Sequence, residues 1–136
     1  MSLLAAALLL SAPLAPDDAG SHDAEFAARD AAVEAAARSW LNLVDARDWE
    51  ASYAGTAAAF RKANTLKLWS DTAQSVHDDL GTMLSRQLLG VDDVPSPQGI
   101  TIVKFRTDYG DRARVIETVS LVREDGAWKV AGIYIS

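Results

Sequence analysis

The sequence predicts an α+β domain, in which N-terminal helices pack on a curved, four-stranded antiparallel meander sheet. Two observations lead to this fold class. Apolar residues recur every three or four positions before Gly81 and every second position after it, which indicates helices followed by half-buried strands. The pair Asp125-Gly126 joins two alternating runs near the C-terminus and is a strong hairpin signal. Helices first and a meander second are typical of an α+β layout.

Length and composition limit the classes of function. With 136 residues the chain is long enough for one domain, which we assign to residues 23–136. A formal net charge of −6 argues against nucleic acid as a partner. Cysteine is absent, which excludes a disulfide scaffold and a thiolate nucleophile. The chain has only two histidines, which argues against a histidine-rich metal site. No metal and no cofactor are predicted.

Residues 1–22 resemble a signal peptide followed by a polar linker. The apolar run Leu3–Leu10 is too short to span a bilayer but suits the apolar core of a secretory signal. Cleavage is expected after Ala12 or Ala15, where small residues and prolines follow the run. We therefore predict an exported protein, periplasmic or secreted, that is not an integral membrane protein once processed. The alternative is a disordered apolar tail.

Three helices are predicted before Gly81. The first covers residues 23–47 and has one apolar stripe, formed by Phe26, Val33, Ala37, Trp40, Leu41 and Val44. A short second helix covers residues 49–56 and continues irregularly through Phe60. The third begins after Thr65, a good N-cap, and ends at Gly81, which suits a C-terminal cap. Its apolar stripe is Leu66, Trp69, Ala73, Val76 and Leu80.

Four strands are predicted near residues 84–94, 99–109, 113–123 and 127–135. The turns that join them are Pro95-Ser96-Pro97, Gly110-Asp111 and Asp125-Gly126. A two-residue last turn pairs Glu124 with Ala127, and counting along both strands then places Glu117 opposite Tyr134. The helix-facing side of the sheet is expected to carry Val115, Glu117, Val119, Leu121, Trp128, Val130 and Tyr134.

The register of the first two strands decides which residues join this face. A second turn of three residues is preferred, because it adds Val103 and Phe105, whereas a two-residue turn would add Lys104. The first strand then contributes Leu84, Arg86 and Leu88. In this register Arg86 comes within reach of Glu117.

The helices and the last strands carry the motifs of a known family. The N-terminal part of the motif consists of Trp40-Leu41, Leu43, Asp45, Trp49 and Ser52-Tyr53. The rest consists of Trp69, Gly81, Arg86, Glu117-Thr118-Val119 and the run from Asp125 to Gly132. Together these residues resemble the bacterial domain of unknown function 4019 (DUF4019), over Ala36 to Ser136. The chain departs from the pattern at Trp49 and Tyr53, where the family usually has Tyr and Trp, and at Arg47, where glycine is common.

The resemblance implies a small exported α+β protein, similar to the cystatin-like and nuclear-transport-factor-2-like (NTF2-like) cone folds. It implies no activity.

Glu117 is the leading candidate site residue, because a carboxylate at the centre of an apolar strand face needs a partner or a purpose. With Tyr134 and Arg86 it would form a ligand-binding group or supply a general base. The structural alternative is an ion pair with Arg86 that closes the inner face of the sheet, and buried charges are usually paired in this way.

Other candidates carry a functional and a structural interpretation side by side. Asp45, near the end of the first helix, is a second possible base, or it bonds backbone amides or pairs with a nearby arginine. His77, on the edge of the third helix's stripe, is interpreted as structural. The aromatic residues would line a pocket or fill the core, and they are Trp40, Trp49, Tyr53, Trp69 and Trp128.

Three functions from different classes remain open. The first is a binding or accessory module that holds a small molecule or a peptide near Glu117. The second is an isomerase-like or hydrolase-like enzyme with Glu117 or Asp45 as general base, which rests on fold analogy. The third is a structural domain that forms a homodimer through the outer face of its sheet.

Overall fold

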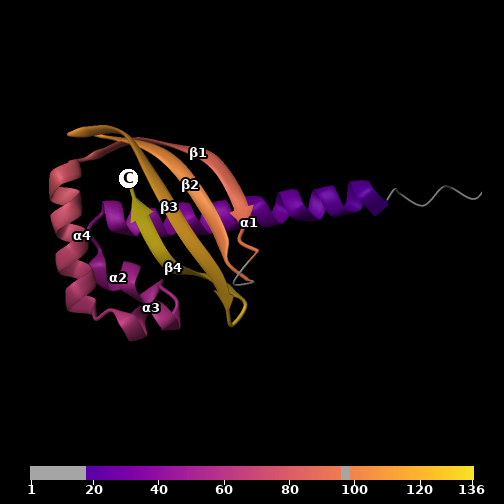
Figure 1. Cartoon of the computed structure of the whole chain (residues 1–136), viewed down its shortest axis with the longest axis horizontal. Coiled ribbons are helices and arrows are strands. Elements are labelled where there is room, and N and C mark those ends of the chain that lie inside the picture. The colour runs from indigo at the N-terminus through magenta and orange to yellow at the C-terminus, as the bar shows by residue number, and fades with distance from the viewer. Residues whose placement is uncertain (1–17, 96–98) are drawn as a thin grey trace, which may run out of the picture.

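The computed structural model describes residues 18–95 and 99–136, and it has the predicted α+β architecture. Four helices come first: α1 (Asp18–Asp45), α2 (Trp49–Ala54), α3 (Ala58–Ala63) and α4 (Leu66–Leu80). Four strands follow: β1 (Met83–Asp93), β2 (Thr101–Tyr109), β3 (Arg112–Glu124) and β4 (Ala127–Ile135). The strands form one antiparallel sheet in the order β1-β2-β3-β4, which confirms the meander. Figure 1 shows α1 lying along the sheet, with α2, α3 and α4 gathered at one end.

Helix α1 packs its predicted stripe on the sheet, from Val33 to Val44, but the stripe starts later than expected. Phe26 is 58 % exposed, because the N-terminal part of α1 extends past the sheet (Figure 1). The helix also begins at Asp18, five residues before its predicted start. It ends ahead of Arg47, whose φ of 57° is left-handed. This backbone conformation gives a physical reason for a glycine at that position.

Local sequence signals set the ends of the later helices. The Asp48 side chain accepts a hydrogen bond from the Ala51 amide, and that of Thr65 accepts one from Leu68. Both contacts satisfy amides that the first helical turn leaves unpaired. Gly81 ends α4 at a φ of 81°, a conformation that favours glycine, and a Cβ atom there would come within 2.6 Å of the Asp111 carboxylate. The predicted caps at Thr65 and Gly81 are thus confirmed.

The last hairpin departs from the predicted register halfway along β4. Glu124 pairs with Ala127 as expected, but the register shifts between Ser120 and Leu121. Because β4 holds one extra residue there, every later side chain changes face. Tyr134 therefore pairs with Thr118 and is 68 % exposed, so the predictions that it faces inward and opposes Glu117 are wrong.

The remaining registers place the site residues almost as predicted. Val103 and Phe105 are fully buried on the helix-facing side, as predicted, but the preferred three-residue second turn is wrong. Tyr109 pairs with Arg112, so the turn has two residues, and one extra residue in β3 between Arg112 and Val115 brings Val103 and Phe105 to the inner face. Arg86 and Leu88 also face inward. Leu84 was wrongly predicted to do so; it is 67 % exposed, because the register shifts between Met83 and Ser85. The first predicted turn, Pro95-Ser96-Pro97, lies partly outside the described residues.

The core lies between α1, α4 and the inner face of the sheet. Its largest cluster consists of Val33, Ala37, Trp40, Leu41, Val44, Trp69, Ala73, Val103, Phe105, Val119, Leu121 and Val130. A second, smaller cluster under the end of α4 consists of Leu80, Tyr109 and Val115. In the described parts of the chain, no helix combines the length and apolar character needed to cross a membrane.

Candidate functional site

A hydrogen-bonded charge network lies between the two core clusters, and Glu117 is at its centre. Glu117 is fully buried, with an exposed fraction of 0 %. Its Oε1 accepts from Arg86 Nε at 2.8 Å and from the Thr107 hydroxyl. Its Oε2 accepts from Arg86 Nη2 at 3.2 Å and from the Tyr109 hydroxyl at 2.8 Å. Both carboxylate oxygens are therefore satisfied by protein groups.

Asp45 joins the same network from the last turn of α1. Arg86 Nη1 donates to Asp45 Oδ2 at 2.7 Å, and Arg86 Nη2 donates to Oδ1 at 3.1 Å. This bidentate geometry is the strong form of an arginine–carboxylate contact. One guanidinium thus joins α1 to β3, and we call the group Asp45, Arg86, Thr107, Tyr109 and Glu117 the buried charge network.

The environment fixes the protonation states of the two donors. Burial by itself would lower the pKa of Arg86, but the hydrogen bonds and charges of Asp45 and Glu117 outweigh burial and raise it. Burial raises the pKa of the Tyr109 hydroxyl, and the adjacent Glu117 carboxylate raises it further. Arg86 therefore stays charged and Tyr109 stays a donor at physiological pH.

The sequence predicts most of this network, and the residue that it does not predict, Tyr109, lies on a regular strand pattern. The predicted pairing of Arg86 with Glu117 is confirmed, as is the prediction that Asp45 pairs with a nearby arginine. Tyr109 was missed, although it continues the same two-residue alternation as Phe105 along β2. Ile135 lies opposite Glu117 in place of Tyr134, and the tyrosine hydroxyl that bonds to Glu117 is that of Tyr109 on β2.

The aromatic residues that were candidates for a pocket or the core mostly belong to the core. Trp40 and Trp69 are buried with ring centroids 5.6 Å apart, and both indole N–H groups donate to Ser52. Tyr53 is half-buried, and its hydroxyl donates to the Asn64 carbonyl at 2.6 Å. Of the three, only Trp69 also lines a hollow.

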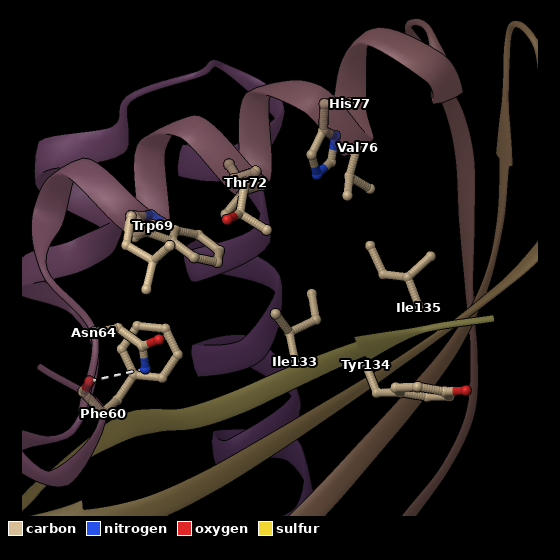
Figure 2. Close-up of a pocket in the computed structure, with 12 residues that line it drawn as sticks. Phe60, Asn64, Trp69, Thr72, Val76, His77, Ile133, Tyr134 and Ile135 are labelled. Carbon is tan, nitrogen blue, oxygen red and sulfur yellow. Dashed lines mark hydrogen bonds between the residues drawn. The ribbon is translucent and has the colours of Figure 1, made fainter.

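That hollow, which we call the α4–β4 groove, lies between α4 and the second half of β4 (Figure 2). Its volume is about 320 Å³. It is lined by Val44, Phe60, Asn64, Leu68, Trp69, Thr72, Ala73, Val76, His77, Ile133, Tyr134 and Ile135. Tyr134 thus borders a hollow, although not the one the sequence predicted.

A smaller cavity of about 170 Å³ lies at the end of α4. It is lined by Asp45, Arg47, His77, Gly81, Thr82, Met83 and Tyr109. Glu117 lines neither this cavity nor the groove.

His77 forms part of the wall between the two hollows. Its ring lies 6.2 Å from that of Trp49 and 5.8 Å from that of Tyr109, measured between centroids. Burial lowers the pKa of His77, although the nearby Asp45 and Glu117 charges act against this. The imidazole is therefore mainly neutral at pH 7 and offers one donor and one acceptor. In residues 18–95 and 99–136, no group of three or more acidic or histidine side chains could hold a metal ion.

The fold and its site define a small α+β domain with a charge network around the fully buried Glu117 and a mostly apolar groove. Asp45 and Tyr109 of the network also border the smaller cavity. A sequence model of the family described as "Protein of unknown function (DUF4019)" matches residues 36–133. The chain belongs to this family, which confirms the resemblance found in its sequence. No curated protein matches the chain. The likeness to cystatin-like and NTF2-like folds stays a prediction.

Proposed function

We propose that the protein is a non-catalytic binding module whose ligand occupies the α4–β4 groove. The observation that carries this proposal is the groove itself. Its volume of about 320 Å³ lies within the range of small-molecule and cofactor sites, and apolar side chains with a few polar groups line it, as in such sites.

The lining indicates the chemistry of the ligand. Among the described residues, no lysine, arginine, aspartate or glutamate borders the groove, so a charged ligand would lose its hydration without gaining a counter-ion there. Asn64, Thr72 and His77 supply hydrogen-bonding groups along an otherwise apolar wall. These features support a neutral, mainly apolar ligand with one or more hydrogen-bonding groups.

The buried charge network supports a structural role for Glu117 in this proposal. A general base has to meet the proton that it removes. Both oxygens of Glu117 already accept hydrogen bonds from side chains, and both oxygens of Asp45 accept from Arg86. The geometry therefore favours a network that ties the end of α1 to the sheet over an enzyme that uses either carboxylate.

Export belongs to the same proposal. Its support is the signal-like run Leu3–Leu10, which lies outside the described residues. The module would then act outside the cytoplasm. Homodimerisation stays a prediction.

Binding in the groove can be tested with an apolar fluorescent probe such as Nile red. We expect saturable binding by the wild type and at least about tenfold weaker binding by Thr72→Trp, because the added indole fills part of the groove. Gln74→Trp is the matched control, since residue 74 is an exposed position of α4 that does not line the groove. Equal binding by wild type and Thr72→Trp would contradict the proposal.

A further inference from the structure

We propose that the ligand of the α4–β4 groove is an extended peptide segment of a partner protein, which pairs with the outer edge of β4 as a fifth strand. This inference rests on the proposed function, because it takes the groove to be the binding site. It adds the chemical class of the ligand and the way in which the ligand is held.

The first argument is the direction of the backbone groups of β4. Ile116 and Ser136 exchange both of their backbone hydrogen bonds across the β3–β4 ladder. In an antiparallel ladder such pairs alternate with pairs that do not bond to each other. The next residues inward, Glu117 and Ile135, are therefore a non-bonded pair, and so are Val119 and Ile133.

The N–H and C=O groups of Ile133 and Ile135 consequently point away from β3, toward the edge of the sheet. Among the described residues, no backbone group outside β3 bonds to either of them. An exposed row of this kind is a template for another strand. Two residues apart on a strand, the two positions are about 6.6 Å from each other, which matches alternate residues of an extended peptide.

The second argument is that the same edge already holds an extended segment of this chain. Val130 donates to the Gly55 carbonyl at 3.1 Å and accepts from the Ala57 amide at 2.7 Å. Thr56, between them, forms a parallel bridge with Val130. The outward position at Val130 is thus occupied by strand pairing, and the groove lies beyond it along β4, at Ile133 and Ile135. A peptide at Ile133 and Ile135 would continue an existing interface.

The third argument is that backbone and side chains of β4 serve the same groove. The extra residue in β4 turns the side chains of Ile133 and Ile135 to the helix-facing side, where both line the groove (Figure 2). A peptide on this edge would place every second side chain against them and against the wall of α4. Recognition by strand addition combines these two elements, main-chain bonds for affinity and pockets for alternate side chains. The expected peptide is apolar at alternate positions and has no proline where its N–H must bond.

A second copy of the chain fits this edge less well. Pairing through two β4 edges would bring a second α4 into the region that the first α4 already lines. A single extended chain requires only one strand spacing, about 4.8 Å. We therefore assign the groove to a partner peptide rather than to a dimer.

The test begins with a displayed library of random short peptides, selected on the wild-type protein. We expect enriched peptides with apolar residues at alternate positions. Their affinity should fall at least about tenfold for Ile133→Pro, which removes one outward N–H without removing a bond to β3, and likewise for Thr72→Trp. Gln74→Trp should bind like the wild type.

Backbone pairing itself is measured on one enriched peptide. Methylation of single amide nitrogens should abolish binding at every second position only. Amide hydrogen exchange of Ile133 and Ile135 should be fast in the free protein and slow in the complex, while the Tyr134 amide, which faces β3, is slow in both. Binding that tolerates methylation at every position overturns strand addition.

The other outcomes separate this inference from the proposed function. If Nile red binds in the groove but no peptide is enriched, the groove binds small molecules and strand addition is wrong. If neither binds, both proposals fail. If ultracentrifugation shows a wild-type dimer that Ile133→Pro converts to a monomer, the edge belongs to a second copy and the partner peptide is wrong.

Discussion

The carboxylate of Glu117 receives hydrogen bonds from three side chains and has no contact with solvent. Glu117→Gln keeps the shape of the side chain but leaves the Arg86 guanidinium facing an amide in place of a carboxylate. Because a broken buried ion pair leaves an uncompensated charge, we expect a loss of about 3 kcal/mol in the free energy of unfolding. Urea unfolding measures this loss.

Glu34→Gln is the matched control for that substitution. Glu34 pairs with Arg38 on the surface of α1, where such pairs contribute less than about 1 kcal/mol. Probe binding in the groove should be unchanged in both variants, because neither residue lines it. A stable Glu117→Gln protein that has lost probe binding would show instead that Glu117 is a ligand-binding residue.

His77 makes the stability of the fold depend on pH. Its pKa in the folded state lies below the value of 6.5 expected when it is exposed, so the unfolded chain binds its proton more readily. The contribution of His77 to stability is therefore complete above about pH 6.5 and is lost as the pH falls through the lower, folded-state pKa. Asp45, Glu117, Arg47 and Arg86 face it and modify the effect.

Replacing the His77 imidazole should make the free energy of unfolding depend less on pH below about pH 6.5. We expect the free energy of unfolding of His77→Gln to change less between pH 7 and pH 5 than that of the wild type. His22→Gln, at the exposed start of α1, is the control substitution. Parallel slopes for the wild type and His77→Gln would mean that the protonation of this residue is not coupled to folding.

The regular spacing of apolar residues predicts the helices and strands. The one extra residue that shifts the register of β4 leaves no mark in that spacing. Thr65, Gly81 and Asp125-Gly126 act through local backbone geometry, so the sequence alone located the start and end of α4 and the last turn. The extra residue in β4 carries no such signal, and it moved Tyr134 to the outer face. Phe26 fits the stripe of α1 equally well, but periodicity does not show where the sheet ends beneath a helix.

The candidate site likewise has one part that the sequence predicts and one part that it does not. The contact between Arg86 and Glu117 followed from register, because a buried charge and an alternating strand together constrain the partner. The α4–β4 groove did not follow, because it depends on how far α4 lies from the edge of the sheet. Neither Asn64 nor Thr72 carries a sequence signal that would place it in the same groove as Ile133. Distances between elements are set by the packing of the whole core, which no single segment encodes.

At the scale of the whole molecule, helix α1 begins well before the core of the domain. Residues 20–28 of α1 are all exposed, and within residues 20–45 the first fully buried side chain is that of Val33. Cleavage after Ala12 or Ala15 therefore leaves every residue of the two described core clusters in the processed chain. If the protein is exported, it should lose 12 or 15 residues and retain its stability within about 0.5 kcal/mol.

The intact mass of the protein, recovered from the periplasm or medium of a bacterial host, measures this processing. Leu8→Arg is the control, because a charge in the middle of the apolar run Leu3–Leu10 should stop export while leaving the described domain unaltered. The Leu8→Arg protein is expected in the cytoplasm at full length, with the same unfolding transition as the processed wild type. A wild-type chain that stays full length in the cytoplasm would contradict export but not the groove, since the residues that line the groove all lie in the folded domain.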